Sequence, residues 1–282
     1  MTFDSNAKIN IGLRIVRKRP DGYHDLETFF QEINLKDTLD IVVTQDHQIT
    51  MTSDSPDCPT DKSNLAYRAA VLMQPQAGVQ QAGCHISIHK TIPVGSGLGG
   101  GSSNAATTLC ALNRLWQCHL QEEQLQTLGA HLGADVPFFI QGGLALGQGI
   151  GEQLTPLPQT IPYWGVLIAP EVAISTATVY QSLNLNLTKR KKITKFVDFI
   201  SSYADTSAWK HTLYNDLETV VFQHYSHFQS IVQTLYNKGA FFASMSGSGS
   251  ALFGLFHNPH DARIAKRQFD PYPTFLFEPI YR

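Results

Sequence analysis

The chain has 282 residues, of which 43% are hydrophobic and 16% charged, as is typical of a soluble globular protein with a sizeable core. The formal net charge is −2, from 21 lysines and arginines against 23 aspartates and glutamates. The molecule therefore lacks an overall basic field, and we expect no nucleic-acid partner. An anionic ligand would have to be attracted by local groups.

The cysteines and the apolar segments indicate the cellular compartment. Cys58, Cys84, Cys110 and Cys118 form no C-x-x-C pair and have no metal-ligand spacing, which favours free thiols in a reducing environment. No apolar run reaches the roughly 18 residues that a membrane span needs, and the first residues lack the features of a leader segment. We expect a cytoplasmic protein without membrane contact, either a monomer or a weak homodimer.

Strands dominate the elements expected in the first third of the chain. Apolar and partly alternating residues at 7–16 predict a half-buried strand, and Pro20-Asp21-Gly22 then predicts a turn. Helical periodicity over residues 64–73, with Ser63 as the N-cap, predicts the first helix. Further strands are expected at residues 29–33, 37–44, 47–53 and 84–92.

Both element types follow in the rest of the chain. The expected helices span residues 103–116, 121–133, 175–183 and 195–203 and lie within 215–237, and the expected strands lie within 142–157 and at 163–169, 239–247 and 250–256. Because strands and helices recur without regular βαβ alternation, the predicted fold class is α+β with two lobes. Three prolines between Thr155 and Pro162 suggest a boundary that divides residues 1–155 from residues 156–282.

A glycine-rich stretch immediately precedes the helix expected at 103–116. So much glycine costs backbone entropy on folding. Such loops at a helix N-terminus commonly bind phosphate, because their bare N–H groups and the helix dipole point at the anion. A purely structural turn is the alternative. The nucleotide-binding residues predicted from this stretch are Pro93, Val94, Gly95, Ser96, Gly97, Leu98, Gly99, Gly100, Gly101, Ser102, Ser103 and Asn104.

Two familiar phosphate loops fit this stretch poorly. The dinucleotide-binding pattern G-x-G-x-x-G is present as Gly95, Gly97 and Gly100, but Glu122 and Glu123, about 20 residues later, fall at the start of a helix instead of the end of a strand. The Walker A pattern fails because no lysine ends the loop. The remaining interpretation is a longer, lysine-free loop in which Ser102 and Ser103 cap the helix and contact phosphate or Mg²⁺.

Lys8 and Asp135 are the candidate catalytic residues. Lys8 interrupts an otherwise apolar strand, and a buried lysine needs a partner. Asp135 lies in the sequence G-A-D-V-P, at a corner between a helix end and Pro137. We therefore expect the two side chains to pair. For each residue taken alone there is an alternative without catalysis: Lys8 as a surface lysine at a strand edge, and Asp135 as a structural aspartate in a turn.

Four segments make the sequence resemble the GHMP small-molecule kinases. They are residues 7–33, 93–106, 133–157 and 245–254, so the resemblance spans nearly the whole chain. The glycine loop is common to the superfamily, whereas DGYH at 21–24 together with GADVPFF at 133–139 is similar to members whose acceptor alcohol carries a cytidine diphosphate. The resemblance implies ATP-dependent phosphorylation of that alcohol's 2-hydroxyl in isoprenoid biosynthesis, with ATP and Mg²⁺ as cofactors. It also implies a two-lobed fold, with an N-terminal mixed or antiparallel sheet, a C-terminal α/β sandwich lobe and the site in the cleft between them.

The same resemblance implies roles for single residues. Asp135 would take the proton of the substrate hydroxyl, and Lys8 would lower the pKa of that hydroxyl and steady the transferring phosphate. Asn64 and Lys90 would lie on the adenine side. The implied substrate contacts are Asn10, Tyr23, His24, Thr176, Tyr180, Gly247 and Ser248.

Some assignments stay open at this point. Asn104 stands where many relatives carry aspartate, so the metal ligands are unknown, with Ser102 or Ser103 as candidates. The basic run at 189–192 is interpreted as a solvated segment. The alternative functions are a GHMP kinase for a simpler alcohol, such as homoserine or mevalonate, and a catalytically silent binding protein with the same fold.

Overall fold

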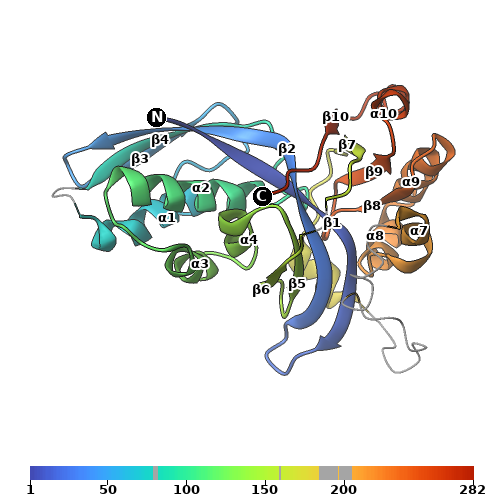
Figure 1. Ribbon diagram of the computed structural model, residues 1–282, viewed down its shortest axis with the longest axis horizontal. Coiled ribbons are helices and arrows are strands. Elements are labelled where there is room, and N and C mark those ends of the chain that lie inside the picture. The colour runs from blue at the N-terminus through green and yellow to red at the C-terminus, as the bar shows by residue number, and fades with distance from the viewer. Residues whose placement is uncertain (79–81, 159, 184–195, 197–204) are drawn as a thin grey trace. The chain divides into compact units, whose positions relative to one another are not determined.

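The computed structural model describes residues 1–78, 82–158, 160–183, 196 and 205–282 (Figure 1). The basic run at 189–192 and, apart from Phe196, the helix expected at 195–203 lie outside these residues. The described residues group into two compact units, each made of several chain segments, and the boundary predicted near residue 155 stays a prediction. Unit 1 comprises Met1–Lys8, Leu35–Val94 and Gly99–Gly142, and unit 2 comprises Ile9–Asn34, Gly95–Leu98 and Gly143–Arg282.

Unit 1 contains a sheet segment covered by helices. Its central strand β4 (Gly83–His89) pairs antiparallel with the end of β2 (His24–Thr44) and parallel with β3 (Ile49–Ser53). Cys84, Ile86 and Ile88 alternate inward on β4 and are buried, as the period of a strand requires. Helices α1 (Leu65–Met73) and α2 (Gly100–Leu115) lie along one face of the sheet, followed by α3 (Glu122–Ala130) and α4 (Val136–Gln141) (Figure 1).

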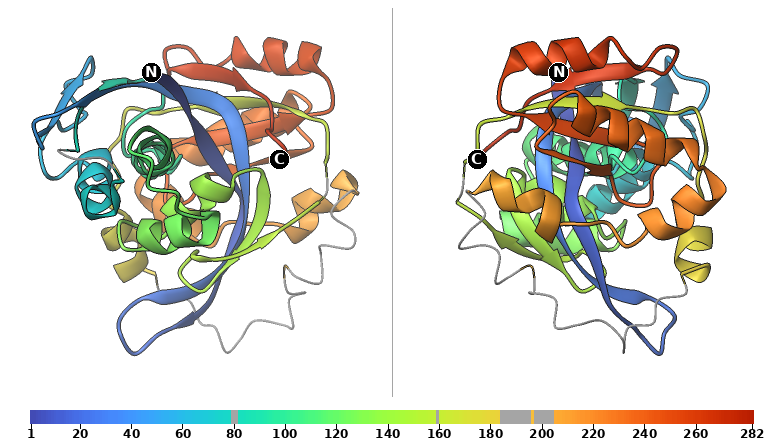
Figure 2. Two further views of the ribbon diagram at one scale, coloured as in Figure 1. Left: turned by 60° about the vertical axis from the view of Figure 1, so that its left-hand side comes forward. Right: turned by 90° about the vertical axis from the view of Figure 1, so that its right-hand side faces the viewer.

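Unit 2 is built around an antiparallel sheet with the strand order β10-β7-β9-β8. Helices α9 and α10 pack on this sheet, and Figure 2 shows both beside it from two further directions. Their apolar side chains, such as Phe228, Leu235 and Ala265, join one core with Val166 and Phe256 of the strands. The elements are β7 (Trp164–Ile168), α5 (Thr176–Gln181), α7 (Trp209–Thr212), α8 (Glu218–His224), α9 (His227–Asn237), β8 (Phe242–Met245), β9 (Leu252–Phe256), α10 (Pro259–Lys266) and β10 (Thr274–Phe277).

A second group of strands in unit 2 is formed by the long N-terminal hairpin, β1 (Thr2–Lys18) and β2, together with two later strands that pair onto β2. Residues 28–31 of β2 pair antiparallel with β5 (Leu144–Gln148), which pairs in turn with β6 (Gln153–Pro156). Strand β1 pairs with β2. The chain's last residues also bind here, since Gln31 Nε2 donates to the Ile280 carbonyl at 2.8 Å and Arg282 reaches the buried Glu32 carboxylate at 2.7 Å.

The mixed helix and strand content and the two sheets confirm the predicted α+β class. Several details differ from expectation. The strands predicted at 29–33 and 37–44 are one strand of 21 residues, because Asn34 remains in extended pairing with Glu278 instead of forming a turn. Helices α4, α7 and α10 and strand β10 were not predicted, and the helical region expected within 215–237 forms the two helices α8 and α9. The N-cap of α1 is Asn64, not Ser63, because the Asn64 Oδ1 accepts from the Ala66 N–H at 2.8 Å.

No helix within the described part of the chain has the length and apolar character needed to cross a bilayer.

Candidate active site

The glycine loop passes through left-handed backbone conformations at alternate residues. Gly95, Gly97 and Gly99 have φ values of 66°, 79° and 72°. A side chain at Gly97 would place its Cβ 2.2 Å from the Ser246 carbonyl oxygen, and one at Gly99 would lie 2.7 Å from the Phe139 ring. Glycine is therefore required at these two positions by neighbouring protein atoms as well as by the backbone conformation. At Gly95, by contrast, a Cβ would meet nothing within 4 Å.

Helix α2 begins at Gly100, three residues before the predicted start. Its N-cap is Gly99, which provides no side-chain cap, and its first bond runs from the Ser103 N–H to the Gly99 carbonyl at 2.8 Å. The prediction that Ser102 and Ser103 cap the helix is therefore wrong, since both residues lie inside it. The Ser103 hydroxyl is buried and bonded to the Ser5 hydroxyl at 2.8 Å, whereas Ser102 is partly exposed in the first turn.

Lys8 and Asp135 form the predicted ion pair in unit 1. The Lys8 Nζ lies 3.5 Å from an Asp135 carboxylate oxygen, and the two side chains are 4% and 32% exposed. Although Asp135 directly precedes helix α4, its carboxylate makes no capping bond to that helix. The carboxylate thus presents one partly exposed face while the buried ammonium lies beside it. Pairing is confirmed by this geometry, and the catalytic role stays a prediction.

A buried carboxylate, Asp37, organises the entrance to the glycine loop. It is fully buried, and its Oδ1 accepts from the Thr91 and Ile92 N–H groups, both at 2.8 Å. Its Oδ2 accepts from the Lys90 ammonium, which is itself largely buried, and from the Asn104 amide at 3.2 Å. Lys90 and Asn104, predicted as nucleotide-binding residues, are therefore brought together by a residue that the sequence interpretation missed.

The strand pattern contained a signal for Asp37. Leu35 and Leu39, two residues to either side, are both buried, so position 37 lies on the inward face of β2. A carboxylate at an inward position needs a cation and hydrogen-bond donors, which Lys90 and the loop entrance supply.

The Asn64 side chain makes local hydrogen bonds. Besides capping α1, it donates from Nδ2 to the Pro59 carbonyl at 2.6 Å. These bonds fix the start of helix α1. The predicted contact of Asn64 and Lys90 with adenine is not tested by them and stays a prediction.

In unit 2, the loop Ser246–Ser250 lies against β1 and the first part of the glycine loop. The buried Ser246 hydroxyl donates to the Gly97 carbonyl at 3.0 Å and accepts from the Asn10 N–H at 3.2 Å. Gly247 has a φ of 56°, and a Cβ there would lie 3.3 Å from the Asn10 Oδ1. The Ser248 hydroxyl is bonded to the Thr176 hydroxyl at 2.7 Å. Four of the predicted substrate contacts, Asn10, Thr176, Gly247 and Ser248, are therefore connected through this loop.

The remaining predicted substrate contacts come from the β1–β2 turn and helix α5. The His24 and Tyr180 rings lie 5.4 Å apart at an interplanar angle of 36°, and Tyr23 is 60% exposed. Burial, followed by the nearby Lys18 charge, lowers the pKa of His24. The imidazole is therefore held more firmly in its neutral form, which can both donate and accept a hydrogen bond.

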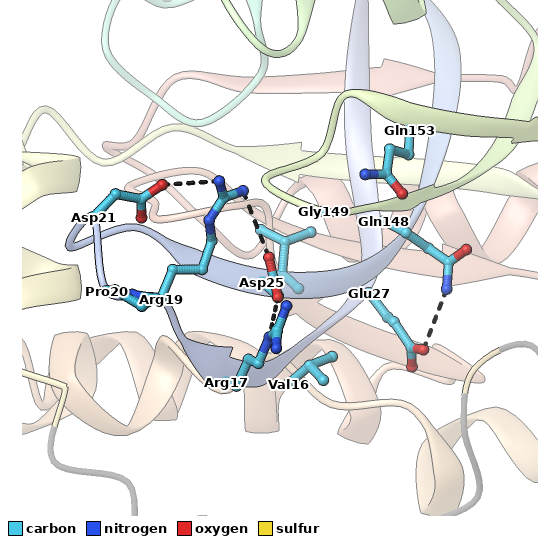
Figure 3. Close-up of a pocket in the computed structure, with 11 residues that line it drawn as sticks. Val16, Arg17, Arg19, Pro20, Asp21, Asp25, Glu27, Gln148, Gly149 and Gln153 are labelled. Carbon is cyan, nitrogen blue, oxygen red and sulfur yellow. Dashed lines mark hydrogen bonds and ion pairs between the residues drawn. The ribbon is translucent and has the colours of Figure 1, made fainter.

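A cavity of about 640 Å³ opens beside the same turn, and none of the predicted site residues lines it (Figure 3). Its charged groups are paired with one another: Arg17 with Asp25, Arg19 with both Asp21 and Asp25. Glu27, on its wall, is paired with Arg14. Because these charges already have partners, the cavity offers little free charge for an anionic ligand. The described residues also contain no cluster of three or more acidic, histidine or cysteine side chains able to hold a metal.

Comparison with known proteins agrees with this arrangement. The family model described as GHMP kinases N terminal domain matches residues 64–143, and the one described as GHMP kinases C terminal matches residues 203–272. The chain belongs to the GHMP kinase family and, as a member, uses ATP to phosphorylate a small molecule.

Named relatives within this family match nearly the whole chain. The chain is 43% identical to the 4-diphosphocytidyl-2-C-methyl-D-erythritol kinase of Prosthecochloris aestuarii over 97% of this chain and 95% of that protein. It is 41% identical to the kinase of the same name from Pelobacter propionicus, over 95% and 94%. A crystal structure of 4-(cytidine 5'-diphospho)-2C-methyl-D-erythritol kinase matches with a TM-score of 0.84, 32% identity and 99% of each chain covered. The Methanococcus jannaschii mevalonate kinase shares the fold, with a TM-score of 0.75 at 14% identity over 99% of this chain and 98% of that chain.

Proposed function

We propose that this GHMP kinase transfers the γ-phosphoryl group of ATP to the 2-hydroxyl of 4-diphosphocytidyl-2-C-methyl-D-erythritol, a step of non-mevalonate isoprenoid biosynthesis. The observation that carries the proposal is the similarity, at 40–43% identity over more than nine-tenths of the chain, to kinases named for that substrate. The aromatic pair His24–Tyr180 and the Lys8–Asp135 ion pair support it, because they offer a surface for a base and a carboxylate for a hydroxyl.

In this proposal the glycine loop, the first turn of α2 and the Lys8–Asp135 pair handle the phosphates and the reacting hydroxyl. The N–H groups of the glycine loop and the first turn of α2 bind the ATP phosphates, helped by the positive end of the helix dipole. Asp135 accepts a hydrogen bond, and then the proton, from the acceptor hydroxyl. Lys8, held at 3.5 Å from Asp135, stabilises the alkoxide and the transferring phosphate as charge develops.

Two side-chain oxygens near the glycine loop suit Mg²⁺, with phosphate and water supplying most of the ion's ligands. The Asn104 Oδ1 is buried without a hydrogen-bond partner, and Ser102, two residues earlier in α2, is partly exposed. Neutral oxygens of this kind fit Mg²⁺, which typically takes few protein ligands when it binds with nucleotide phosphates. When bound, the ion would neutralise phosphate charge and align the phosphate oxygens.

The residues of unit 2 bind the acceptor in this proposal. Tyr180 and Tyr23 offer ring faces for the cytosine, and the neutral His24 offers hydrogen bonds to it. The loop residues Gly247 and Ser248 bind the diphosphate through backbone N–H groups and a hydroxyl.

A coupled assay of ADP release tests the proposal. With ATP and Mg²⁺ present, we expect turnover on the cytidyl diphosphate alcohol to exceed turnover on homoserine or mevalonate by at least about a thousandfold, because those alcohols lack the base and diphosphate that unit 2 would bind. Comparable or faster turnover on one of the simpler alcohols would reassign the substrate. No ADP release with any of the three would favour a silent binding protein.

A further inference from the structure

The loop that carries Gly247 and Ser248 is anchored by a residue outside every motif described so far. Asn215 lies just before helix α8, is 3% exposed, and directs its amide nitrogen at two backbone carbonyls of this loop. The Asn215 Nδ2 donates to the Met245 carbonyl at 2.9 Å and to the Gly247 carbonyl at 2.7 Å. These carbonyls flank Ser246, so one side chain holds the first residues of the loop.

The chemistry of the asparagine side chain suits this task closely. Its amide nitrogen carries two hydrogens, one for each carbonyl, while its oxygen accepts from the Leu217 N–H at 3.0 Å. Replacing the amide removes one donor from each of two buried carbonyls, and a buried acceptor that loses its partner costs more than an ordinary hydrogen bond. The second anchor at this point is Glu218, whose carboxylate accepts from the Met245 N–H and the Ser244 hydroxyl, both at 2.7 Å.

The backbone around Asn215 is fixed to strand β1. The Leu13 N–H donates to the Tyr214 carbonyl at 2.8 Å, and the Asp216 N–H donates to the Leu13 carbonyl at 2.8 Å. The Asp216 carboxylate accepts from the Ile15 N–H at 2.6 Å. Asn215 therefore projects from a segment joined to the strand that carries Asn10.

We infer that Asn215 is a positioning residue for the acceptor substrate: it sets the conformation of residues 245–248, and through them the placement of Gly247 and Ser248. The inference rests on the proposed function for its kinetic consequence, since that function assigns this loop to the substrate diphosphate. It does not require Asn215 to touch the substrate. It predicts that loss of the amide donors weakens acceptor binding strongly and ATP binding much less, since the glycine loop is reached through the Ser246–Gly97 hydrogen bond.

The test uses the full chain with Asn215→Asp, which keeps the acceptor for Leu217 but turns two donors into an acceptor facing two carbonyls. We expect KM for 4-diphosphocytidyl-2-C-methyl-D-erythritol to rise at least tenfold and KM for ATP to change less than threefold. The matched control is Asn113→Asp in unit 1, because Asn113 likewise donates from Nδ2 to a carbonyl and accepts at Oδ1, both at 2.9 Å. This control should lower the melting temperature while leaving both KM values within about twofold of wild type.

Two results would overturn the inference: a folded Asn215→Asp variant with the wild-type acceptor KM, or one in which both KM values rise equally. If Asn215→Asp does not fold, Asn215→Ser, which removes the amide without adding a carboxylate, is measured against the same expectations.

Hydrogen exchange separates this inference from the proposed function. Amides of residues 244–250 should exchange at least tenfold faster in the Asn215 variant than in wild type, with no change in Asn113→Asp. Faster amide exchange in the Asn215 variant, together with no turnover of the cytidyl substrate by wild type, would overturn the proposed function and retain the positioning role. Unchanged amide exchange in the variant would overturn the positioning role, whatever the substrate.

Discussion

The two units place their candidate residues by different physical means. In unit 1 the loop entrance and the Lys8–Asp135 pair are set by buried or partly buried charges, with Asp37 holding Lys90. In unit 2 the Ser246–Ser250 loop is set largely by neutral hydrogen bonds from Asn215 and among hydroxyl groups. A buried charge that loses its partner is much more costly than a neutral hydrogen bond that is lost. Substitutions of similar size should therefore have unequal effects in the two units.

The largest effect is expected from Asp37→Asn. The substitution leaves the Lys90 ammonium buried without its carboxylate, so the free energy of unfolding should fall by about 3 to 5 kcal/mol. Urea denaturation followed by circular dichroism measures it. The double variant Asp37→Asn with Lys90→Met removes both charges and should recover part of this loss. A loss below about 1 kcal/mol in the single variant would mean that buried charge does not distinguish unit 1.

Asp135→Asn should act on the reaction more than on the fold. The Asp135 side chain is 32% exposed, so its loss affects stability little, whereas removal of the proton acceptor should lower kcat at least about a hundredfold, equivalent to about 2.7 kcal/mol. Asp46→Asn, an exposed turn aspartate in the same unit, is the control and should keep the wild-type kcat. A kcat within threefold of wild type in Asp135→Asn would remove this carboxylate from the mechanism.

The smallest effect is expected at Glu218, whose carboxylate binds Ser244 and Met245 just before the Ser246–Ser250 loop of unit 2. Burial raises the pKa of Glu218 from 4.5 to about 7, despite the hydrogen bonds from Ser244 and Met245 that favour the ionised form. In the folded state the Glu218 carboxyl therefore keeps its proton at pH values where the same carboxyl has lost it in the unfolded chain. The raised pKa stabilises the folded state fully below about pH 4.5, and this contribution is lost as the pH rises through about 7.

The measurement is the free energy of unfolding of wild type minus that of Glu218→Gln between pH 5 and pH 8. Because the side chain is partly exposed, we expect this difference to fall by about 1 to 2 kcal/mol as the pH rises. A difference that is constant or increases with pH would contradict the raised pKa.

Local patterns were sufficient for the elements with strong periodicity. The alternation at 84–92, the helical pattern at 64–73 and the strand pair near the C-terminus all appear as β4, α1, β8 and β9. The pattern failed at 34–36, where the partner of Asn34 is Glu278, almost at the other end of the chain. A prediction from neighbouring residues has no access to such a contact. Helix α4 was missed for a related reason, because a segment of six mostly apolar residues is too short to distinguish a buried helix from a strand or corner.

The candidate site shows the same division. Lys8 was recognisable because an isolated lysine in an apolar strand demands a partner, and Asp135 was found as that partner. Asn215 carries no comparable signal, since an asparagine before a helix is ordinary. Its role depends on two carbonyls 30 and 32 residues away, and only their positions reveal it.

The amino-acid sequence alone determined the α+β class, the glycine loop and the family resemblance, because each depends on residue type and short spacing. It also predicted the pairing of Lys8 with Asp135 from residue type, and the structure confirmed that pairing. The tertiary structure alone decided which protein atoms require glycine at positions 97 and 99, that Asp37 binds Lys90, and that Asn215 and Glu218 hold the second loop. Those contacts depend on directions and distances between segments remote in the chain. Side chains such as asparagine and aspartate acquire a specific role only when folding places their donors and acceptors opposite particular partners.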